Sequence, residues 1–214
     1  MRTRIKICGI TLVEDAHSVV QCGADAIGLI FYPSSPRHVQ IDQAKEVTNA
    51  VGAFVTTVGV FVNPEINYLQ EVLRNVPIDI IQFHGNESPE FCLQADKPYI
   101  KAIRVKDGID LEAEAQRYSS SRGILLDSFV PGVVGGTGET FAWEKTNEVK
   151  SHPVILAGGI NRSNVDTVIS EHKPYAIDIS SGVEIDKGIK SGAAIEQFMQ
   201  AVRRQDQITY GSNT

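Results

Sequence analysis

Short apolar runs alternate along the chain with segments in which apolar residues recur at helical spacing. The short runs are nearly continuous in Ile, Val, Leu, Phe and Ala, which is typical of parallel strands covered on both faces. The segments between them have the periodicity of helices. The eight predicted strands lie at about residues 4–8, 26–31, 56–62, 78–83, 99–104, 123–127, 153–157 and 175–180.

This alternation predicts an α/β fold built on a parallel sheet. Eight strand–helix units match the count and length of a compact, single-domain (β/α)8 TIM barrel. An open doubly wound sheet is the alternative, but it usually has about five to seven strands and a stronger glycine fingerprint at its first turn. We expect the barrel to cover residues 1–205, with a polar, frayed tail over residues 206–214.

Several predicted helix starts carry capping signals. A capping residue accepts a hydrogen bond from a backbone N–H of the first turn, and proline is favoured at the first helical position. The signals are the capping boxes Thr11-x-x-Glu14 and Ser163-x-x-Asp166, the pairs Asn63-Pro64 and Ser88-Pro89, and the single residue Asp42.

Composition and charge limit the classes of partner. The net charge is -6 and the basic residues are scattered, which argues against nucleic acid. No apolar run approaches the roughly 18 residues of a membrane span, and the N-terminus does not resemble a signal peptide, so we expect a cytoplasmic protein. Cys8, Cys22 and Cys92 are odd in number and lack metal-ligand spacing, which argues against disulfides and a metal site.

Chemically active residues follow the predicted strands. In barrels of this kind the active site lies at the carboxyl ends of the strands. A thiol, a carboxyl group and two glycine-bearing loops at these ends supply a base, an acid and a phosphate site. The loops Gly158-Gly159 and Ser180-Ser181-Gly182 follow the last two strands, where many barrels bind phosphate. The strand-end residues are Cys8, Arg37, Asn63, His84, Arg104, Asp127, Gly158, Gly159, Ser180, Ser181 and Gly182.

Nine motifs occur in order over residues 4–200. They are Lys6-Ile-Cys-Gly-Ile-Thr11, Gly28-Leu-Ile-Phe, Ser35-Pro-Arg37, Gly59-Val-Phe-Val-Asn63, Gln82-Phe-His-Gly85, Leu126-Asp-Ser128, Gly135-Gly-Thr-Gly138, Leu156-Ala-Gly-Gly-Ile160 and Asp178-Ile-Ser-Ser-Gly-Val-Glu184. With these motifs the chain resembles the N-(5'-phosphoribosyl)anthranilate isomerase family. The resemblance implies a cofactor-free Amadori rearrangement of an aminoaldose phosphate to an aminoketose phosphate in tryptophan biosynthesis.

The resemblance also implies roles for individual residues. Cys8 matches the general base that takes the C2 proton, and Asp127 matches the general acid that opens the sugar ring. Arg37 matches the partner of the anthranilate carboxylate. Because a free thiol and a free carboxyl group have the wrong protonation states at pH 7, we expect nearby positive charge to lower the pKa of Cys8 and burial to raise that of Asp127.

The sequence does not fix a single role for three other positions, Thr137, His84 and Ala142. Thr137, in the glycine segment 135–138, is expected to touch the ligand when that segment closes over the site. His84 either hydrogen-bonds the substrate or supports the barrel mouth. Ala142 stands where the family usually has an acidic residue, which leaves the anchoring of this segment open. The partner is expected to be a small phosphosugar, and the sequence leaves monomer and homodimer equally open.

Alternate residues of a strand point to the same face of the sheet, and this alternation, or strand parity, gives one further expectation. Lys6 and Cys8 share a face of the first strand, and Asp178 and Ser180 share a face of the last, which neighbours the first in a closed barrel. If Cys8 points into the barrel, Lys6 does too, and a buried lysine needs a partner. We therefore expect an ion pair between Lys6 and Asp178.

Two alternatives remain open. One is a different enzyme on the same fold, such as indole-3-glycerol phosphate synthase, but no lysine ends the third predicted strand. The other is a non-catalytic barrel that only binds a phosphate ligand. The presence of both Cys8 and Asp127 argues against a binder, which has no need of an acid and a base.

Overall fold

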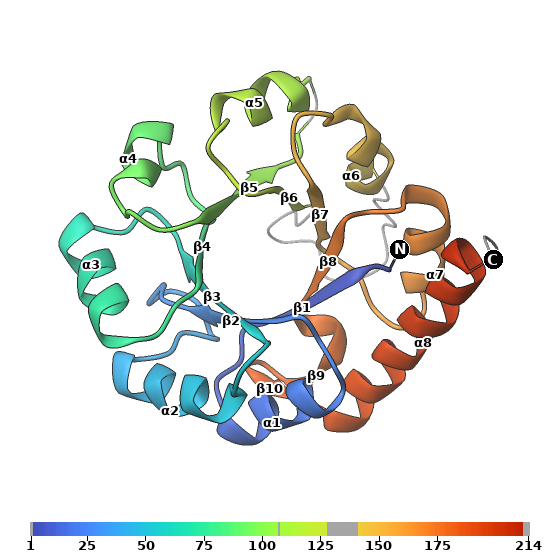
Figure 1. The fold of residues 1–214 in the computed structure, drawn as a ribbon, viewed down its shortest axis with the longest axis horizontal. Coiled ribbons are helices and arrows are strands. Elements are labelled where there is room, and N and C mark those ends of the chain that lie inside the picture. The colour runs from blue at the N-terminus through green and yellow to red at the C-terminus, as the bar shows by residue number, and fades with distance from the viewer. Residues whose placement is uncertain (1, 107, 128–140, 212–214) are drawn as a thin grey trace.

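The computed structural model describes residues 2–106, 108–127 and 141–211. The eight predicted strands form a closed parallel barrel in chain order, with the last strand paired to the first. Helices surround the barrel as an outer ring (Figure 1). The predicted (β/α)8 barrel is therefore confirmed. Thr137 and the glycine segment 135–138 lie outside the described residues.

The strand positions agree with the apolar runs to within two residues at either end. The strands of the barrel are β1 (Arg4–Cys8), β2 (Ala26–Ile30), β3 (Thr56–Phe61), β4 (Ile80–Phe83), β5 (Tyr99–Arg104), β6 (Ile124–Asp127), β7 (Val154–Ala157) and β8 (Ala176–Ile179). A short antiparallel hairpin of β9 (Glu184–Asp186) and β10 (Ile189–Lys190) follows β8 and was not predicted.

The helices differ widely in length. The long ones are α1 (Val13–Gln21), α2 (Ile41–Val51), α3 (Ile66–Asn75) and α8 (Gly192–Tyr210). The shorter ones are α4 (Pro89–Leu93), α5 (Leu111–Arg117), α6 (Phe141–Glu144), α7 (Val165–Thr167), the 3-10 helices η1 (Lys145–Glu148) and η3 (Ser181–Val183), and the π-helix η2 (Val168–His172).

The core has two layers because alternate strand residues point to opposite faces of the sheet. Side chains such as Ile7, Ile27 and Phe83 are fully buried in the large cluster between barrel and helices. A smaller cluster, which includes Val58 and Leu125, fills the barrel interior. Most residues on both faces of the strands are therefore apolar, which explains why the strands appear in the sequence as nearly continuous apolar runs.

One proline-linked cap is confirmed and the other is wrong. The Ser88 hydroxyl accepts a hydrogen bond from the backbone N–H of Phe91, at 3.2 Å, and caps α4. The pair Asn63-Pro64 does not begin a helix, because α3 starts two residues after the proline. The Asn63 side chain instead accepts a hydrogen bond from the N–H of Asn86, in the loop after β4.

The three remaining capping predictions are also wrong. Thr11 donates its hydroxyl hydrogen to the Gly188 carbonyl in the β9–β10 hairpin. Ser163 donates to the Asn161 side chain within its own loop. Asp42 lies inside the first turn of α2, which begins one residue earlier. In the first two cases a tertiary or loop contact takes the hydroxyl that would otherwise cap a helix.

The C-terminal segment is ordered further than predicted. Helix α8 continues through Tyr210, so residues 206–210 are helical and not a frayed tail. Asp206 is buried within this stretch and accepts hydrogen bonds from the backbone N–H and the hydroxyl of Thr3, at 2.9 and 2.7 Å. These bonds tie the end of α8 to the residue that precedes β1.

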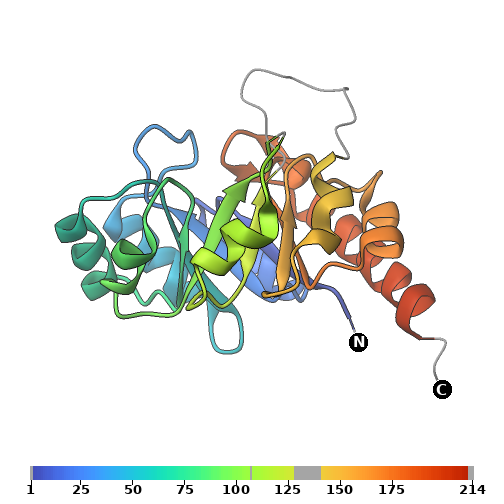
Figure 2. The ribbon, with the colours of Figure 1, turned by 90° about the horizontal axis from the view of Figure 1, so that it is seen from above.

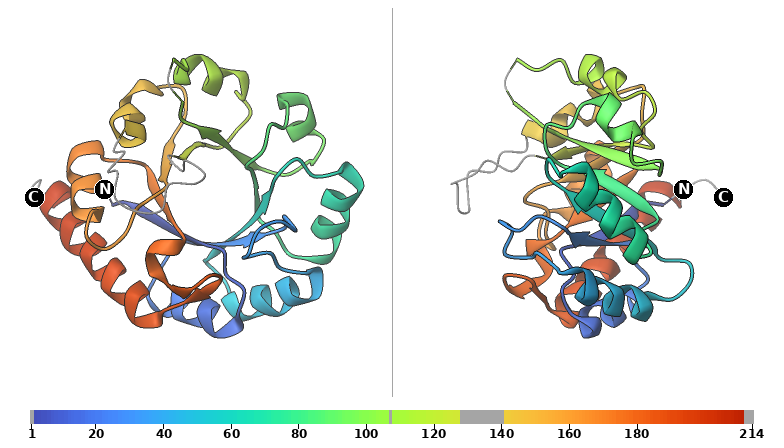
Figure 3. Two further views of the ribbon diagram at one scale, coloured as in Figure 1. Left: turned by 180° about the vertical axis from the view of Figure 1, so that it is seen from behind. Right: turned by 90° about the vertical axis from the view of Figure 1, so that its left-hand side faces the viewer.

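The functional loops and the chain ends lie on opposite sides of the barrel. The loop after β2 and the β9–β10 hairpin rise together from one side (Figure 2). The start of β1 and the end of α8 point away from that side (Figure 3). The carboxyl ends of the strands therefore open onto a face surrounded by loops, where barrels of this kind place their active sites.

Candidate active site

The Cys8 thiol occupies the last position of β1 and is only 7% exposed. Cys8 lies beside Gly28 of β2 in the strand register. A Cβ atom at position 28 would lie 2.7 Å from the Cys8 sulfur, closer than side-chain atoms pack. Glycine at this position therefore leaves the space that the thiol occupies.

Lys6 and Asp178 form a buried ion pair, as strand parity predicts. They are register partners on β1 and β8, and Lys6 Nζ donates to Asp178 Oδ2 at 2.8 Å. Both side chains are 7% exposed. Burial alone would lower the pKa of Lys6, but the attraction of Asp178 and Cys8 outweighs it and raises that pKa. Lys6 therefore remains charged inside the barrel.

The pKa of Cys8 departs from its usual value in the direction opposite to our expectation. Burial raises the pKa of the thiol, and the Asp178 carboxylate adds to the rise. Lys6 and Lys190 act in the other direction but do not cancel it. The predicted lowering is wrong because burial of the thiol outweighs the positive charge around it.

Arg37 lies in the loop after β2 and pairs with Glu184 at the start of β9. Its Nε and Nη2 atoms donate to the two carboxylate oxygens at 2.7 and 2.6 Å. Lys190 of β10 donates to the same carboxylate at 2.7 Å. Burial alone would raise the pKa of Glu184, but hydrogen bonds from Arg37 and Lys190 hold that pKa below its usual value.

This pairing changes how Arg37 can bind a ligand. In the described part of the chain, Glu184 takes the bidentate edge formed by Nε and Nη2. A guanidinium group has a second bidentate edge, formed by Nη1 and the other hydrogen of Nη2. A carboxylate ligand would therefore meet Arg37 at its outer edge, with the side chain already oriented by Glu184.

Asp127, the last residue of β6, lies beside His84 of the loop after β4. Asp127 Oδ2 and His84 Nε2 are 3.1 Å apart. Gln82 Nε2, which can only donate, lies 2.8 Å from His84 Nδ1. Nδ1 is therefore the acceptor, Nε2 carries the imidazole hydrogen, and His84 donates to Asp127. The strand-end histidine contacts the predicted acid directly.

A second buried ion pair supports the loops beside His84. Lys101 Nζ lies 3.0 Å from Glu87 Oε2, and the two side chains are 3% and 1% exposed. Lys101 also donates to the Gly85 carbonyl at 2.7 Å. Glu87 accepts hydrogen bonds from the backbone N–H groups of Asn63 and Gly85. The pair thus joins the loops after β3 and β4 to β5 and fixes the backbone next to His84.

The loop after β7 has the backbone geometry expected of a glycine-dependent turn. Gly158 and Gly159 have positive φ angles of 83° and 67°. The side-chain amides of Asn161 and Asn164 both donate to the Gly159 carbonyl, at 3.1 and 2.9 Å. These bonds fix the conformation of the loop.

The loop after β8 offers backbone groups to the site, because its first side chain, that of Ser180, already forms hydrogen bonds within the protein. The Ser180 hydroxyl donates to the Cys8 carbonyl at 3.0 Å and lies 3.3 Å from Lys190 Nζ. Ser181 and Gly182 begin the short helix η3. A Cβ atom at Gly182 would overlap the Ile160 carbonyl oxygen, so the two loops approach each other closely at this point.

Replacing Gly182 by Ala should disrupt both loops at once. The added methyl group requires a shift of the backbone at Ile160, and overpacking of this kind typically costs about 1–3 kcal/mol. We expect a lower unfolding midpoint in denaturant and weaker binding of inorganic phosphate. Gly192→Ala is the matched control, because a Cβ there would meet only the Ser18 side chain, at 3.3 Å from its hydroxyl oxygen. Equal stability and phosphate affinity in both variants would contradict the close approach.

Several residues that complete the site were not predicted from the sequence. Glu184 ends one of the nine motifs, but no role was predicted for it, and together with Lys190 it belongs to an unpredicted hairpin. Gln82 and Lys101 did carry a signal, since each interrupts an otherwise apolar strand. A polar residue on a strand that is covered on both faces needs a buried partner. A buried partner is therefore predictable for Gln82 and Lys101 just as it is for Lys6.

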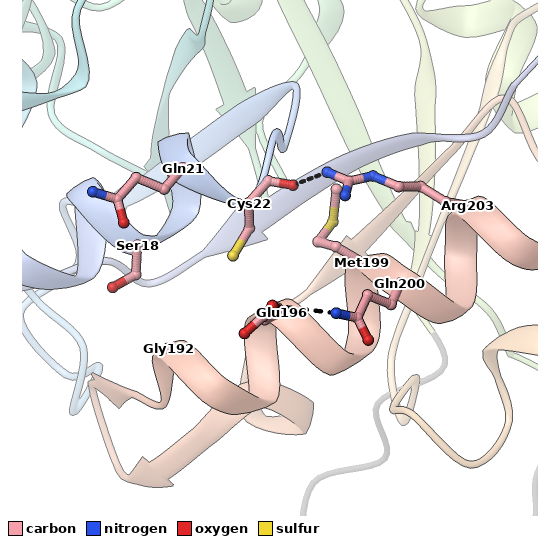
Figure 4. Close-up of a pocket in the computed structure, with 8 residues that line it drawn as sticks. All are labelled: Ser18, Gln21, Cys22, Gly192, Glu196, Met199, Gln200 and Arg203. Atoms are coloured by element: carbon pink, nitrogen blue, oxygen red, sulfur yellow. Dashed lines mark hydrogen bonds between the residues drawn. The ribbon is translucent and has the colours of Figure 1, made fainter.

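A separate hollow lies between α1 and α8, on the outside of the barrel (Figure 4). Its lining includes Cys22, Glu196 and Arg203, and none of the strand-end residues discussed above. Across the described ranges, no three or more His, Cys, Asp or Glu side chains are grouped as a metal site requires. Nor does any described helix combine the length and apolar character needed to cross a membrane.

Comparison with known proteins shows the family of this chain over almost its whole length. The model of the family described as N-(5'-phosphoribosyl)anthranilate (PRA) isomerase matches residues 5–201. The protein of that name from Pseudomonas putida F1 is 53% identical over 201 residues, a match that covers 94% of this chain and 98% of the relative.

Solved structures of the same family have the same fold. One is a phosphoribosylanthranilate isomerase in complex with reduced 1-(o-carboxyphenylamino)-1-deoxyribulose 5-phosphate, at 34% identity and a TM-score of 0.79. Another contains monomers generated from the dimeric enzyme of Thermotoga maritima, at 32% identity and a TM-score of 0.77. Each match covers 94% of this chain and 99% of the solved one.

Proposed function

We propose, because the chain belongs to the N-(5'-phosphoribosyl)anthranilate isomerase family, that it converts N-(5'-phosphoribosyl)anthranilate to 1-(2-carboxyphenylamino)-1-deoxyribulose 5-phosphate in tryptophan biosynthesis. The reaction is an Amadori rearrangement, which needs one acid and one base but no redox partner. The observation that supports it most strongly is the presence of a thiol and a carboxyl group at strand ends of one barrel, with the thiol above the buried Lys6–Asp178 ion pair and the carboxyl group hydrogen-bonded to His84.

Asp127 is the proposed general acid. It protonates the ring oxygen of the ribose, the C1–O bond breaks, and the anilino nitrogen lone pair forms the C1=N bond of a Schiff base. His84 donates to Asp127 Oδ2 and so orients the carboxyl group toward the barrel interior. The same hydrogen bond stabilises the carboxylate that remains after the proton has moved.

Cys8 is the proposed general base. As a thiolate it removes the proton from C2, the electron pair of that C–H bond forms the C1=C2 double bond, and the π pair of C1=N returns to the nitrogen to give the enolamine. The enolamine then takes up a proton at C1 and loses one from the C2 hydroxyl to become the ketone. Cys8 and Asp127 come from β1 and β6, so the sugar must lie across the barrel mouth between them.

The groups that bind the carboxylate and the phosphate of the substrate lie around the acid and the base. The outer edge of Arg37 takes the anthranilate carboxylate, because Glu184 occupies the inner edge. The backbone of Gly158, Gly159 and residues 181–182 holds the phosphate through N–H groups, which brings an anion to a chain of net charge -6 without a basic patch. Thr137 remains a proposed ligand contact from the sequence alone.

The raised pKa of Cys8 predicts how activity depends on pH. Only the deprotonated thiol can accept the C2 proton, and burial shifts that form to higher pH. We therefore expect kcat/KM to increase from pH 6.5 to pH 8.5, about tenfold per pH unit while the thiol is mostly protonated. The profile is measured with freshly prepared substrate, after subtraction of its spontaneous decay. A rate that is constant or decreases over this range would contradict a thiolate base.

The test of the function is direct. Purified protein is mixed with freshly made phosphoribosylanthranilate, the loss of anthranilate fluorescence is followed, and the product is identified by NMR. We expect the aminoketose, with a CH2 group at C1, at a rate far above that of buffer. A folded protein that binds the ligand but leaves it unchanged would favour the non-catalytic phosphate-binding barrel.

A further inference from the structure

Lys6 and Cys8 share one space inside the barrel. They are two residues apart on β1, and both side chains lie against Gly28 of β2. A Cβ atom placed there would be 2.7 Å from the Cys8 sulfur and 3.1 Å from Lys6 Cε. The ammonium end of Lys6 is then fixed by Asp178 at 2.8 Å. The proposed base therefore has a buried cation immediately beneath it.

Four charged groups, Lys6, Asp178, Lys190 and Arg37, act on this thiol, and a fifth, Glu184, pairs with the last two. Lys6 and Asp178 come from strands β1 and β8, while Arg37, Glu184 and Lys190 come from the loop after β2 and the β9–β10 hairpin. Arg37 and Lys190 both bond to Glu184. The set contains three cations and two carboxylates, so one positive charge is in excess next to a group that must become negative.

We propose that Lys6 is a positioning residue for the base: its ammonium group, held in place and kept charged by Asp178, stabilises the thiolate of Cys8. The proposal rests on the proposed function in one respect, that Cys8 accepts the substrate proton. Asp178 gives Lys6 a counter-charge at the stage when Cys8 is a neutral thiol. Lys6 gives Cys8 a counter-charge at the stage when Cys8 is a thiolate. The buried ammonium group is therefore paired throughout.

The two partners should affect Cys8 in opposite directions. Removing the Asp178 carboxylate leaves Lys6 with the thiolate as its nearest counter-charge and should favour the thiolate. Removing Lys6 alone would leave Asp178 as a buried, unpaired carboxylate, because its Oδ1 has no hydrogen-bond partner among the described residues. Removing both charges together avoids that defect, since substitution of a whole buried pair is often tolerated. The double variant should disfavour the thiolate.

The experiment measures the ionisation of Cys8 in the substrate-free protein. Alkylation by iodoacetamide is followed from pH 6 to pH 11 by mass spectrometry of the peptide that contains Cys8, which separates this thiol from Cys22 and Cys92. Wild type is compared with Asp178→Asn and with Lys6→Met/Asp178→Asn. The matched control is Lys101→Met/Glu87→Gln, which removes an equally buried ion pair that does not act on Cys8. Thermal unfolding confirms that each protein is folded.

The expected result is a pair of opposite shifts. The midpoint of Cys8 alkylation should fall in Asp178→Asn and rise by about one pH unit in the double variant, a tenfold loss of thiolate at pH 7. The control should keep the wild-type midpoint. With substrate, kcat of the double variant at pH 7 should fall by about the same factor while KM stays unchanged.

Two results would overturn the inference. One is a double variant whose alkylation midpoint equals that of wild type. The other is an upward shift in both Asp178 variants and in the control, which is what a general loosening of the barrel would produce. Alkylation needs no turnover, so the two tests can be separated. The expected shifts in a protein without isomerase activity would support the role of Lys6 and would contradict the proposed function.

Discussion

Replacing Asp127 by Asn should lower kcat by about 10²–10⁴-fold, the usual contribution of a positioned general acid. Asn has nearly the shape of Asp and can still accept a hydrogen bond from His84, so the fold and the substrate site should persist. It cannot deliver a proton to the ring oxygen. The measurement is steady-state loss of anthranilate fluorescence, with kcat and KM determined separately.

The control for Asp127→Asn is Asp42→Asn, which removes an almost fully exposed carboxylate on α2. That variant should keep the wild-type kcat. If Asp127→Asn also retained activity within about threefold, Asp127 would not be the acid, and ring opening would depend on another group. A large rise in KM at constant kcat would instead assign Asp127 to binding.

Replacing Cys8 by Ser should lower kcat by a similar or larger factor, because a hydroxyl is far less acidic than a thiol and does not form a useful base near pH 8. The smaller oxygen fits the space beside Gly28 without strain. Ring opening by Asp127 does not need Cys8, so this variant should still form the Schiff base. Rapid mixing should therefore show an imine intermediate that Asp127→Asn never reaches.

Cys22→Ser provides the matched control for Cys8→Ser. Cys22 follows α1, is partly exposed, and has no place in the proposed chemistry. This control should retain full activity. Equal losses in the two cysteine variants would point to general destabilisation and contradict a specific role for Cys8.

The strands could be predicted because each is buried on both faces. Residues 99–104, for example, are apolar throughout apart from Lys101 and the exposed Arg104, and the predicted strand matches β5 residue for residue. A barrel with eight such runs in chain order has few alternative topologies. The fold therefore follows from the order and number of the runs more than from any single one.

The helix caps were predicted less well because hydroxyl and amide side chains have several competing partners. Thr11 and Asn63 both sit beside loops that come from distant parts of the chain, and each bonds across to one of them. Ser88 bonds to no distant loop within the described ranges and caps α4 as expected. Local sequence describes the residue's capacity to cap, while the tertiary neighbours decide whether it does.

The strand-end positions of Cys8, His84 and Asp127 were predictable, but their electrostatics were not. The sequence indicated positive charge near Cys8 and did not indicate that burial would outweigh it. It also left undecided whether His84 meets the substrate or the protein, and the structure places it on Asp127. Glu184 reaches Arg37 because the β9–β10 hairpin lies beside the loop after β2.

A single-turnover reaction tests the central claim most directly. Protein in excess over freshly made phosphoribosylanthranilate is mixed with it, and anthranilate fluorescence and product are followed together. The account predicts one rapid loss of fluorescence and one equivalent of the aminoketose. A trace identical to buffer, or release of free anthranilate in place of the ketose, would contradict it.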